Sequence, residues 1–443
     1  MHTLKKMLAT LGELLVVAIG VAAWVLLSWW QALVLAALVV VWMALARGGR
    51  RTASVTRVGL STLPQRLGSS SVVVIGIAGV VAVLVALLSM ANGYQHTLQS
   101  TGSNDTAIVM RGGSASETMS VLSRAAILTV EEAPGIARDA QGKPLASPEL
   151  VVAARLPVGG AGSDAMAGAS LRGIGPEAWK VRPNVHMVAG RHFKTGMREL
   201  IAGVGAARKF GLHVGQSVKL GSQTWQVVGI FKAGNALDSE LWADAATVAS
   251  TYRRASTRNA VIVRLTRPEA FARFKAMLAS QPSLAVSVQT TRAYYSQQAK
   301  GVTKMLRVVG ITVGSIMAIG ALFGALNCMF ATVASRAREI ATLRAIGFRG
   351  VPVVVAVMLE TLLLALLGGV LGGLIAWLVF NGYTASTIAG GASGLGQLSF
   401  QLRVSGELFW NGLKWALAIG FVGGLFPAVR AARLPVTTAL RQS

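Results

Sequence analysis

The segment VPVVVAVMLETLLLALLGGVLGGLIAWLVF, residues 351–380, decides the fold of this protein. Its only charged side chain is that of Glu360. A helix needs about 20 apolar residues to cross the hydrocarbon core of a bilayer, which is roughly 30 Å thick. The segment therefore predicts a membrane-spanning helix, and its single carboxylate, which is costly in lipid, should face protein, water or the interface. We expect a structural polar contact for Glu360, with a transport role as the alternative.

Other apolar segments meet the same criterion at Val72–Leu88, Val308–Val333 and Leu408–Val429. The region Leu14–Ala46 is too long for one ordinary crossing and is interrupted by Ser28-Trp29-Trp30-Gln31. It predicts two short helices with a turn at Ser28–Gln31, where the tryptophans anchor the chain at the interface. The predicted fold class is an α-helical membrane protein with about six transmembrane helices, and a large α+β extracytoplasmic domain inserted between helices 3 and 4.

The composition and the placement of charge agree with this class. The chain has 443 residues, of which 53% are hydrophobic and 13% are charged, whereas about a quarter of the residues of a soluble protein are charged. Basic residues flank the predicted helices on one side, at Lys5, Lys6, Arg47, Arg50, Arg51, Arg57, Arg336, Arg338, Arg344, Arg349, Arg430, Arg433 and Arg441. The positive-inside rule then predicts cytoplasmic termini, and it places residues 93–304 and 381–407 on the outer side of the membrane.

The chain divides into four predicted regions: an N-terminal membrane hairpin and basic linker at 1–58, transmembrane helix 3 at 59–92, an extracytoplasmic domain at 93–304, and a domain with three transmembrane helices at 305–443. Within the outer domain, Asn259–Thr266, Pro268–Ala279 and Leu284–Gln289 have the spacing of a β-α-β unit. A strand pair is predicted at Ser217–Leu220 and Thr224–Phe231, after a helix at Ala206–Phe210 that stops at Gly211.

Two features of the outer domain leave alternatives open. The Gly-, Ala- and Ser-rich stretch Val158–Gly175 is expected to be an exposed loop, with substrate gating as the alternative. The region from Tyr94 to Lys300 carries 24 basic and 13 acidic residues. This surplus is expected to be a solvated surface, with an acidic partner or anionic lipid headgroups as the alternative. Nucleic acid is not an expected partner, because no compact basic patch with interleaved aromatic residues is present.

The sequence contains no common catalytic or metal-binding motif. Cys328 is the only cysteine, so one chain cannot form a disulfide framework or a thiolate metal site. Gly142-Lys143 is followed by Pro144 and lacks the earlier glycine of a P-loop, while the spacing of His186 and His192 fits no common zinc pattern. We therefore expect a chain without enzymatic activity, cofactor or metal of its own.

The segment SRAREIATLRAIGFR, residues 335–349, lies between two predicted membrane helices. Ala337, Ile340, Ala341 and Arg344 fall on one helical face, and Gly347 is placed to end the helix. A short amphipathic helix parallel to the membrane is predicted. It is either an interfacial anchor or a coupling helix seated in a cytoplasmic ATPase.

This loop resembles that of the FtsX/MacB-like family of ABC transporter permeases, the family of MacB, LolC and LolE. The resemblance extends through RLGSSSVVVIGIAGVVAVLVALLSMANG at 66–93, ETLLLALLGGVLGG at 360–373 and GGLFPAVRAARLPVTTALR at 423–441. It covers residues 59–443 in order. The chain lacks the ATPase domain that is fused to MacB, and the N-terminal hairpin is additional to the family core.

The resemblance implies a permease subunit that pairs with a second copy or homologue above a separate cytoplasmic ABC ATPase dimer, which holds ATP and Mg²⁺. It implies that the residues contacting the ATPase are Arg338, Glu339, Thr342, Leu343, Arg344 and Gly347. It also implies mechanotransmission, in which ATP hydrolysis moves the extracytoplasmic domain. The function expected is export or extraction of a hydrophobic or amphipathic substrate, with a periplasmic adaptor and outer-membrane channel as further partners. The alternative is a regulator that transports nothing and activates an extracytoplasmic cell-wall hydrolase.

Glycines four residues apart within the predicted membrane helices favour close helix packing. They are Gly320 and Gly324, Gly368 and Gly372, and Gly369 and Gly373. Either a dimer seam or a tight contact within one chain is expected at these positions, and ordinary tolerance of glycine within a helix is the alternative.

Overall fold

The computed structural model describes residues 67–159, 164–281, 284–346, 350–388 and 397–433, with residues 20, 23–24, 26–46, 49–50, 52–54 and 56–57. The chain splits into two units. The first, here called the helical unit, contains Met1–Ser89, Leu306–Asn381 and Arg403–Ser443. The second, the sheet unit, contains Met90–Met305 and Gly382–Leu402. Two of the four boundaries between the units, at 89/90 and 305/306, fall within long helices.

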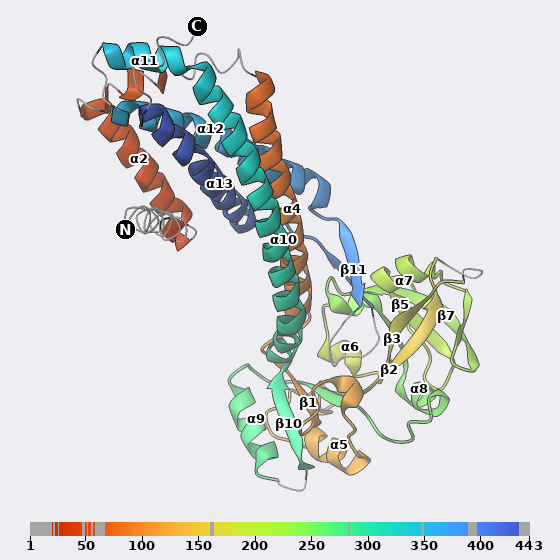
Figure 1. The fold of residues 1–443 in the computed structure, drawn as a ribbon. Helices are drawn as coiled ribbons and strands as arrows, with labels where there is room; N and C mark the ends of the chain where they lie inside the picture. Colours follow the sequence, from red (N-terminus) through yellow and green to blue (C-terminus); the bar gives the residue numbers. More distant parts are fainter. Residues whose placement is uncertain are drawn as a thin grey trace, which may run out of the picture. The chain divides into compact units, whose positions relative to one another are not determined.

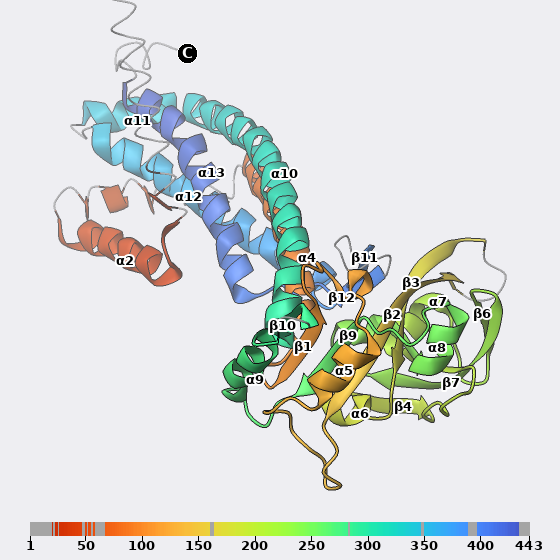
Figure 2. The same cartoon turned by 90° about the horizontal axis from the view of Figure 1, so that it is seen from below.

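Among the described residues, four helices are long and apolar enough to cross a membrane: α4 (Leu67–Gln99), α10 (Thr291–Ser335), α12 (Gly350–Phe380) and α13 (Gly406–Arg433) (Figure 1). Each contains one of the four apolar segments predicted from the sequence, and each extends beyond it. In the helical unit α12 and α13 run side by side (Figures 1 and 2). Val81, Val85, Leu364, Ala365 and Ala416 are among the buried side chains that pack between these helices.

The N-terminal hairpin is described in part. Helix α2 (Trp29–Leu45) has 17 residues and begins after the N-cap residue Ser28, whose backbone N–H donates to the side chain of Gln31. The predicted turn at Ser28–Gln31 is therefore wrong in its extent: Trp29–Leu45 is helical, and the Gln31 side chain caps the helix start by accepting from the Ser28 N–H. The Trp24 indole donates to the carbonyl of Lys414 on α13 at 3.0 Å. Most of the first hairpin helix lies outside the described residues, so the count of about six spans stays a prediction.

The sheet unit is built on a mixed sheet with the order β10-β1-β9-β2-β3-β8-β5-β7-β4, and β6 also pairs with β7. Its first lobe contains β1 (Thr106–Arg111), β9 (Ala260–Arg264) and β10 (Val286–Thr290), with α5 (Arg124–Glu131) and α9 (Ala270–Ala279). Both helices pack apolar side chains against these strands. The predicted β-α-β elements are confirmed, and β1 lies between β9 and β10 as the antiparallel partner of both.

The second lobe holds the remaining strands. They are the C-terminal part of β2 (Ala146–Pro157), β3 (Met166–Ile174), β4 (His186–Gly190), β5 (Glu199–Gly203), β6 (Ser217–Leu220), β7 (Gln223–Lys232) and β8 (Glu240–Asp244). Helices α6 (Ala178–Val181), α7 (Val204–Phe210) and α8 (Ala245–Thr251) accompany these strands (Figure 2). Helices α7 and α8 contribute side chains to one buried cluster, and α6 contributes to another. The predicted β6–β7 hairpin and the helix ending at Gly211 are confirmed.

Strand β2 joins the two lobes. Residues 146–149 pair with β9 of the first lobe, and residues 150–157 pair with β3 of the second. Much of the predicted loop Val158–Gly175 is in fact β3. Its small residues suit this strand because Gly173 lies against the backbone of Ala245 in α8, where a Cβ would be 2.9 Å from Cα.

A β-hairpin separates α12 from α13 in sequence. Strands β11 (Thr384–Ile388) and β12 (Gln397–Gln401) pair with each other and belong to the sheet unit. The backbone N–H of Ser399 donates to the hydroxyl of Ser239, and the ring of Phe400 meets that of Tyr94 edge-on, with 5.5 Å between centroids. Gly93 leaves no room for a side chain beside the carbonyl of Gln401. The hairpin is therefore packed on the body of the sheet unit.

Candidate functional site

The predicted amphipathic helix is present as α11 (Ala337–Ala345), between α10 and α12. Ile340 and Ala341 are buried, and Ile340 packs among Val333, Val357 and Ala431 from the three long helices around it. The side chains of Ala337 and Arg344 on the same face are half-buried. The face predicted from the sequence is thus the one that packs against the helical unit.

The opposite face of α11 is polar and exposed. Arg338, Glu339 and Thr342 are all exposed, and the Thr342 hydroxyl donates to the carbonyl of Arg338 at 2.9 Å. Of the remaining predicted contact residues, Arg344 is half-buried, while the side chain of Leu343 and all of Gly347 lie outside the described residues. The structure thus brings Arg338, Glu339 and Thr342 together on one accessible surface, here called the α11 face.

Arg336, the N-cap residue of α11, ties this helix to α12. Its Nη1 donates to Glu360 at 3.0 Å, and its Nε donates to Glu339 at 3.1 Å. The Arg336 side chain is 11% exposed and that of Glu360 is 6% exposed. A carboxylate in a membrane helix needs such a partner, because an unpaired buried charge is costly. The polar contact expected for Glu360 is therefore present, and no local pattern in the sequence indicates Arg336, 24 residues away, as its partner.

The predicted glycine positions fall into two groups. In α12, Gly368 lies against Val74 and Ile77 of α4, and Gly372 lies against the backbone of Ala78. Gly369 and Gly373 face α13, where the nearest side chains are those of Leu413, Ala416 and Phe409. In α10, a Cβ on Gly320 or Gly324 would meet no described atom within 4 Å. The α12 glycines thus lie at close contacts within the chain, and the α10 glycines lie on an open surface.

A second group of charged residues, unpredicted from the sequence, is buried where β2 passes between the lobes. Arg172 of β3 donates from Nη1 to Glu117 at 2.6 Å and to Glu149 at 2.8 Å, and its Nε donates to Glu240 at 2.7 Å. Arg182 donates to both carboxylate oxygens of Glu149, at 2.5 and 2.8 Å. These five residues are here called the buried charge cluster.

The pKa values within this cluster follow from burial and pairing. Burial disfavours ionisation of Glu149, but Arg182 and Arg172 outweigh it and hold the pKa of this carboxyl below its usual value. Burial is the largest effect on Glu117 and raises its pKa, because Arg172 is shared with two other carboxylates. Burial also opposes the charge on Arg172, yet its acidic partners raise its pKa well above the usual value. Arg172 is therefore a fixed cation that holds segments from both lobes.

The buried charge cluster lies at the end of the β2–β9 pairing. Glu149 is the last residue of β2 that pairs with β9, and Leu150 is the first that pairs with β3. Asn259 reinforces the same point, since its side chain accepts from the N–H of Val151 at 2.6 Å and donates to the carbonyl of Ser120 at 2.8 Å. Within the described parts of the chain no group of three or more His, Cys, Asp or Glu is arranged to hold a metal ion. The cluster is a set of ion pairs that joins the lobes.

Comparison with known proteins found two family models. Residues 70–281 match the model described as MacB-like periplasmic core domain, and residues 311–436 match the model described as FtsX-like permease C-terminal. The search of curated proteins found no significant match.

Several solved structures are weakly similar to part of this chain, and they include two extracytoplasmic domains. The extracellular domain of the noncanonic ABC-type transporter YknZ from Gram-positive bacteria is 16% identical, with a TM-score of 0.32 over 42% of this chain and 100% of that chain. The periplasmic region of MacB from Actinobacillus actinomycetemcomitans is 14% identical, with a TM-score of 0.32 over 44% of this chain and 93% of that chain. The family assignment depends on the two family models, whose order fits the helices and sheet described above. This chain belongs to the FtsX/MacB-like family of ABC transporter permeases.

Proposed function

We propose that this permease couples ATP hydrolysis by a separate ABC ATPase dimer to a conformational change of its extracellular domain. The observation that carries the proposal is the two-sided environment of α11. Ile340 and Ala341 are buried against the long helices, while Arg338, Glu339 and Thr342 are exposed and available to a partner. A force applied to the α11 face would therefore act on packed helices.

The contacts within each unit support a route for this motion. Arg336 links the start of α11 to Glu360 in α12. Helix α12 continues in sequence into the β11–β12 hairpin, which packs within the sheet unit on Ser239 and Tyr94. In this proposal the hairpin, together with the continuous helices α4 and α10, carries the displacement of α11 to the extracellular domain.

A second permease copy is part of the proposal. The open glycines Gly320 and Gly324 lie on α10 near the exposed side chains of Ile316, Ile319 and Phe323. Small residues let membrane helices approach closely, so this surface suits a seam between two copies. ATP and Mg²⁺ would be bound by the ATPase, and no catalysis is proposed for this chain.

The proposed location is the bacterial inner membrane, with both termini and α11 in the cytoplasm and the 93–304 domain in the periplasm. Membrane lipid surrounds the helices, and a periplasmic adaptor with an outer-membrane channel would complete an export pathway. The proposed activity is export or extraction of a hydrophobic or amphipathic molecule. The competing function is that of a regulator that activates a cell-wall hydrolase without transporting anything.

The proposal is tested by reversing charge on the α11 face through the double substitution Arg338→Glu and Glu339→Arg, since both side chains are exposed. The tagged chain is purified from membranes of its host, and the amount of associated ABC ATPase is measured. We expect association to be lost. The matched control, Lys143→Glu with Glu177→Lys, reverses an ion pair of 2.6 Å in the sheet unit and should leave association unchanged. Association that survives the α11 reversal would refute the proposal.

The ATPase activity of the purified complex distinguishes the transporter from the regulator. A transporter is expected to hydrolyse ATP faster when its amphipathic substrate is added. A regulator would show no such stimulation and would be purified together with a hydrolase.

A further inference from the structure

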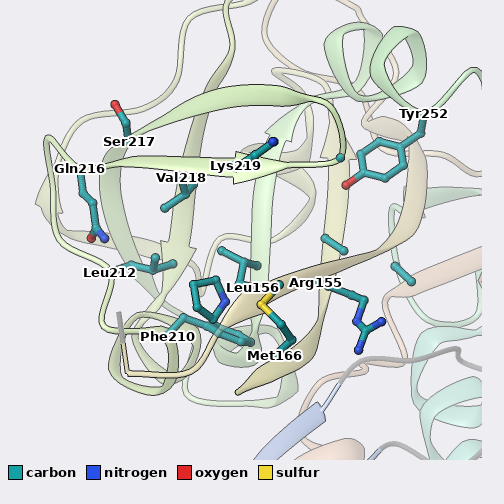
Figure 3. A pocket seen from close by; sticks show the side chains of 14 residues that line it. Arg155, Leu156, Met166, Phe210, Leu212, Gln216, Ser217, Val218, Lys219 and Tyr252 are labelled. Atoms are coloured by element: carbon teal, nitrogen blue, oxygen red, sulfur yellow. The ribbon is translucent and has the colours of Figure 1, made fainter. Parts of the chain in front are cut away.

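A slot opens in the second lobe between β2 and β6 (Figure 3). Its volume is about 570 Å³, and consecutive residues of both strands line it, at 153–157 in β2 and 217–219 in β6. Leu156, Phe210, Leu212 and Val218 supply apolar surface. Among the described strands, β6 pairs only with β7 and residues 150–157 of β2 pair only with β3. The slot is therefore bounded by two unpaired strand edges.

The hydrogen-bond phase of β2 directs part of its backbone into the slot. In an antiparallel pair, alternate residues direct their N–H and C=O toward the partner strand. The N–H of Val158 donates to the carbonyl of Ala165 at 2.8 Å, just beyond the β2–β3 ladder. The even-numbered residues of β2 therefore direct their backbone N–H and C=O groups toward β3. The N–H of Val151 points the other way, since it donates to Asn259 at 2.6 Å. The N–H and C=O groups of Ala153 and Arg155 thus face the slot.

Strand β6 has the matching arrangement. The carbonyl of Gln216 accepts from Val227 at 2.8 Å, and the N–H of Gln226, the residue opposite Ser217, donates away from β6 to the carbonyl of Arg198 at 2.9 Å. Ser217 and Lys219 therefore occupy the positions whose backbone groups point away from β7. An exposed strand edge of this kind is a template for a further strand.

One side chain in the slot also lacks a partner. The Tyr252 hydroxyl is buried and has no hydrogen-bond partner among the described residues. Figure 3 shows its ring beside the end of β6 with the hydroxyl directed into the gap. A buried hydroxyl without a partner is costly, and the carbonyl of an inserted peptide would satisfy it.

The positive charge that lines the slot favours an acidic partner. Arg155 and Lys219 line it, and neither forms an ion pair with a described carboxylate. Lysine and proline on an edge strand oppose pairing with a second copy, and here Lys219 lies on β6 and Pro157 ends β2. An acidic strand has the complementary charge.

We propose that the slot binds an extended acidic segment of a partner protein, which pairs with the free edge of β6. The backbone groups of Ser217 and Lys219 bond the segment, its apolar side chains contact Leu156 and Val218, and its carboxylates meet Arg155 and Lys219. This is recognition by β-augmentation, in which main-chain hydrogen bonds give affinity and side-chain contacts give specificity. The site is separate from α11 and does not depend on the proposed coupling.

The test uses the full chain in lipid nanodiscs and a fluorescent hexapeptide of alternating valine and glutamate. Binding is measured by fluorescence anisotropy. We expect saturable binding that weakens about tenfold when alternate peptide nitrogens are methylated, because each methyl group replaces one N–H donor of the peptide backbone and leaves its partner carbonyl without that hydrogen bond. A peptide of alternating valine and lysine should bind at least about tenfold more weakly. Equal binding of the methylated peptide would overturn the proposal, because it would show that the slot binds an acidic, partly apolar peptide without strand pairing. The absence of saturable binding would also overturn it.

Substitutions in β6 locate the site. Ser217→Pro removes a slot-facing N–H without breaking the β7 ladder and should weaken binding about tenfold, whereas Ser217→Ala keeps that N–H and should bind normally. Lys219→Glu should reverse the preference toward the lysine peptide, which keeps the proposal testable if Ser217→Pro does not fold. Unchanged binding by Ser217→Pro together with unchanged preference by Lys219→Glu would refute the site. Self-association of the chain that Ser217→Pro abolishes would show that a second copy is the occupant and would contradict the acidic partner.

Discussion

The guanidinium of Arg336 lies 3.0 Å from the carboxylate of Glu360, and this pair joins the start of α11 to the N-terminal half of the membrane helix α12. Both side chains are largely buried, and Glu339 on α11 shares the same arginine. A buried ion pair contributes little net stability, but loss of one partner is costly. The pair is therefore better suited to fixing the position of α11 than to stabilising the fold.

Glu360→Gln should uncouple α11 from α12. It leaves the Arg336 charge without its buried partner, so we expect a destabilisation of about 3 kcal/mol and a large loss of ATP-dependent activity in the assembled complex. Thermal melting of the purified chain measures the first effect, and ATPase assays of the complex measure the second. Arg336→Lys, which keeps the charge, should retain more of both. A Glu360→Gln protein with normal melting and normal ATPase activity would contradict this role.

Glycines in α12 and α10 should respond differently to a larger side chain. Gly372→Val places a side chain against the backbone of Ala78 and should lower the melting temperature strongly, because helices α12 and α4 must separate. Gly320→Val meets open space within the chain and should leave the melting temperature of the monomer unchanged while weakening dimerisation. Melting and mass measurements on the same detergent-solubilised samples check both. Equal effects on melting would show that the α10 glycines are packed within the chain.

Removal of Arg172 should separate the lobes of the sheet unit. Arg172→Leu leaves Glu117, Glu149 and Glu240 with less compensation, and we expect a loss of several kcal/mol of stability, since breaking a buried pair costs about 3–5 kcal/mol. Arg172→Lys keeps the positive charge but cannot form the same set of directed hydrogen bonds, so its loss should be smaller. Limited proteolysis would detect the change as faster cleavage between the lobes. Wild-type protection in Arg172→Leu would contradict a joining role for the cluster.

Acid stability should depend on Glu199. Arg191 donates to both of its carboxylate oxygens and holds its pKa at about 2, below the usual 4.5. Because the pKa is lowered by folding, the resulting stabilisation is present above pH 4.5 and is lost as the pH falls from 4.5 toward 2. In melts of the full chain, wild type should lose more stability across this interval than Glu199→Gln. Parallel pH profiles for the two proteins would exclude the effect.

The sequence predicted the membrane helices and the burial of one face of α11 because both depend on local apolar patterns. Val351–Phe380 is recognisable by length alone, and the 3.6-residue spacing of Ile340 and its neighbours shows which side packs. Glycine spacing in α12 and α10 is identical, yet only the three-dimensional structure distinguishes the packed Gly372 from the open Gly320. The glycine spacing indicates that a close helix contact is possible, but whether a neighbouring helix occupies that position depends on the tertiary structure.

Contacts between residues far apart in sequence were not predictable. Glu117, Glu149, Arg172 and Glu240 appear as ordinary surface charges until the sheet topology brings them together. Likewise, the Gly- and Ala-rich residues of β3 have weak strand propensity, and they form a strand because α8 packs closely on Gly173. In both cases tertiary context overrides the local pattern.

The most direct test is whether nucleotide bound by the ATPase moves the extracellular domain through α11. Lys275→Cys in a Cys328→Ser background places one spin label on exposed α9, and pulsed dipolar spectroscopy measures the distance between the labels of two copies in the ATPase complex. We predict that a nonhydrolysable ATP analogue with Mg²⁺ shifts this distance, and that the shift is abolished by Glu360→Gln. An unchanged distance in a complex with wild-type ATPase activity would contradict the coupling proposed for this permease.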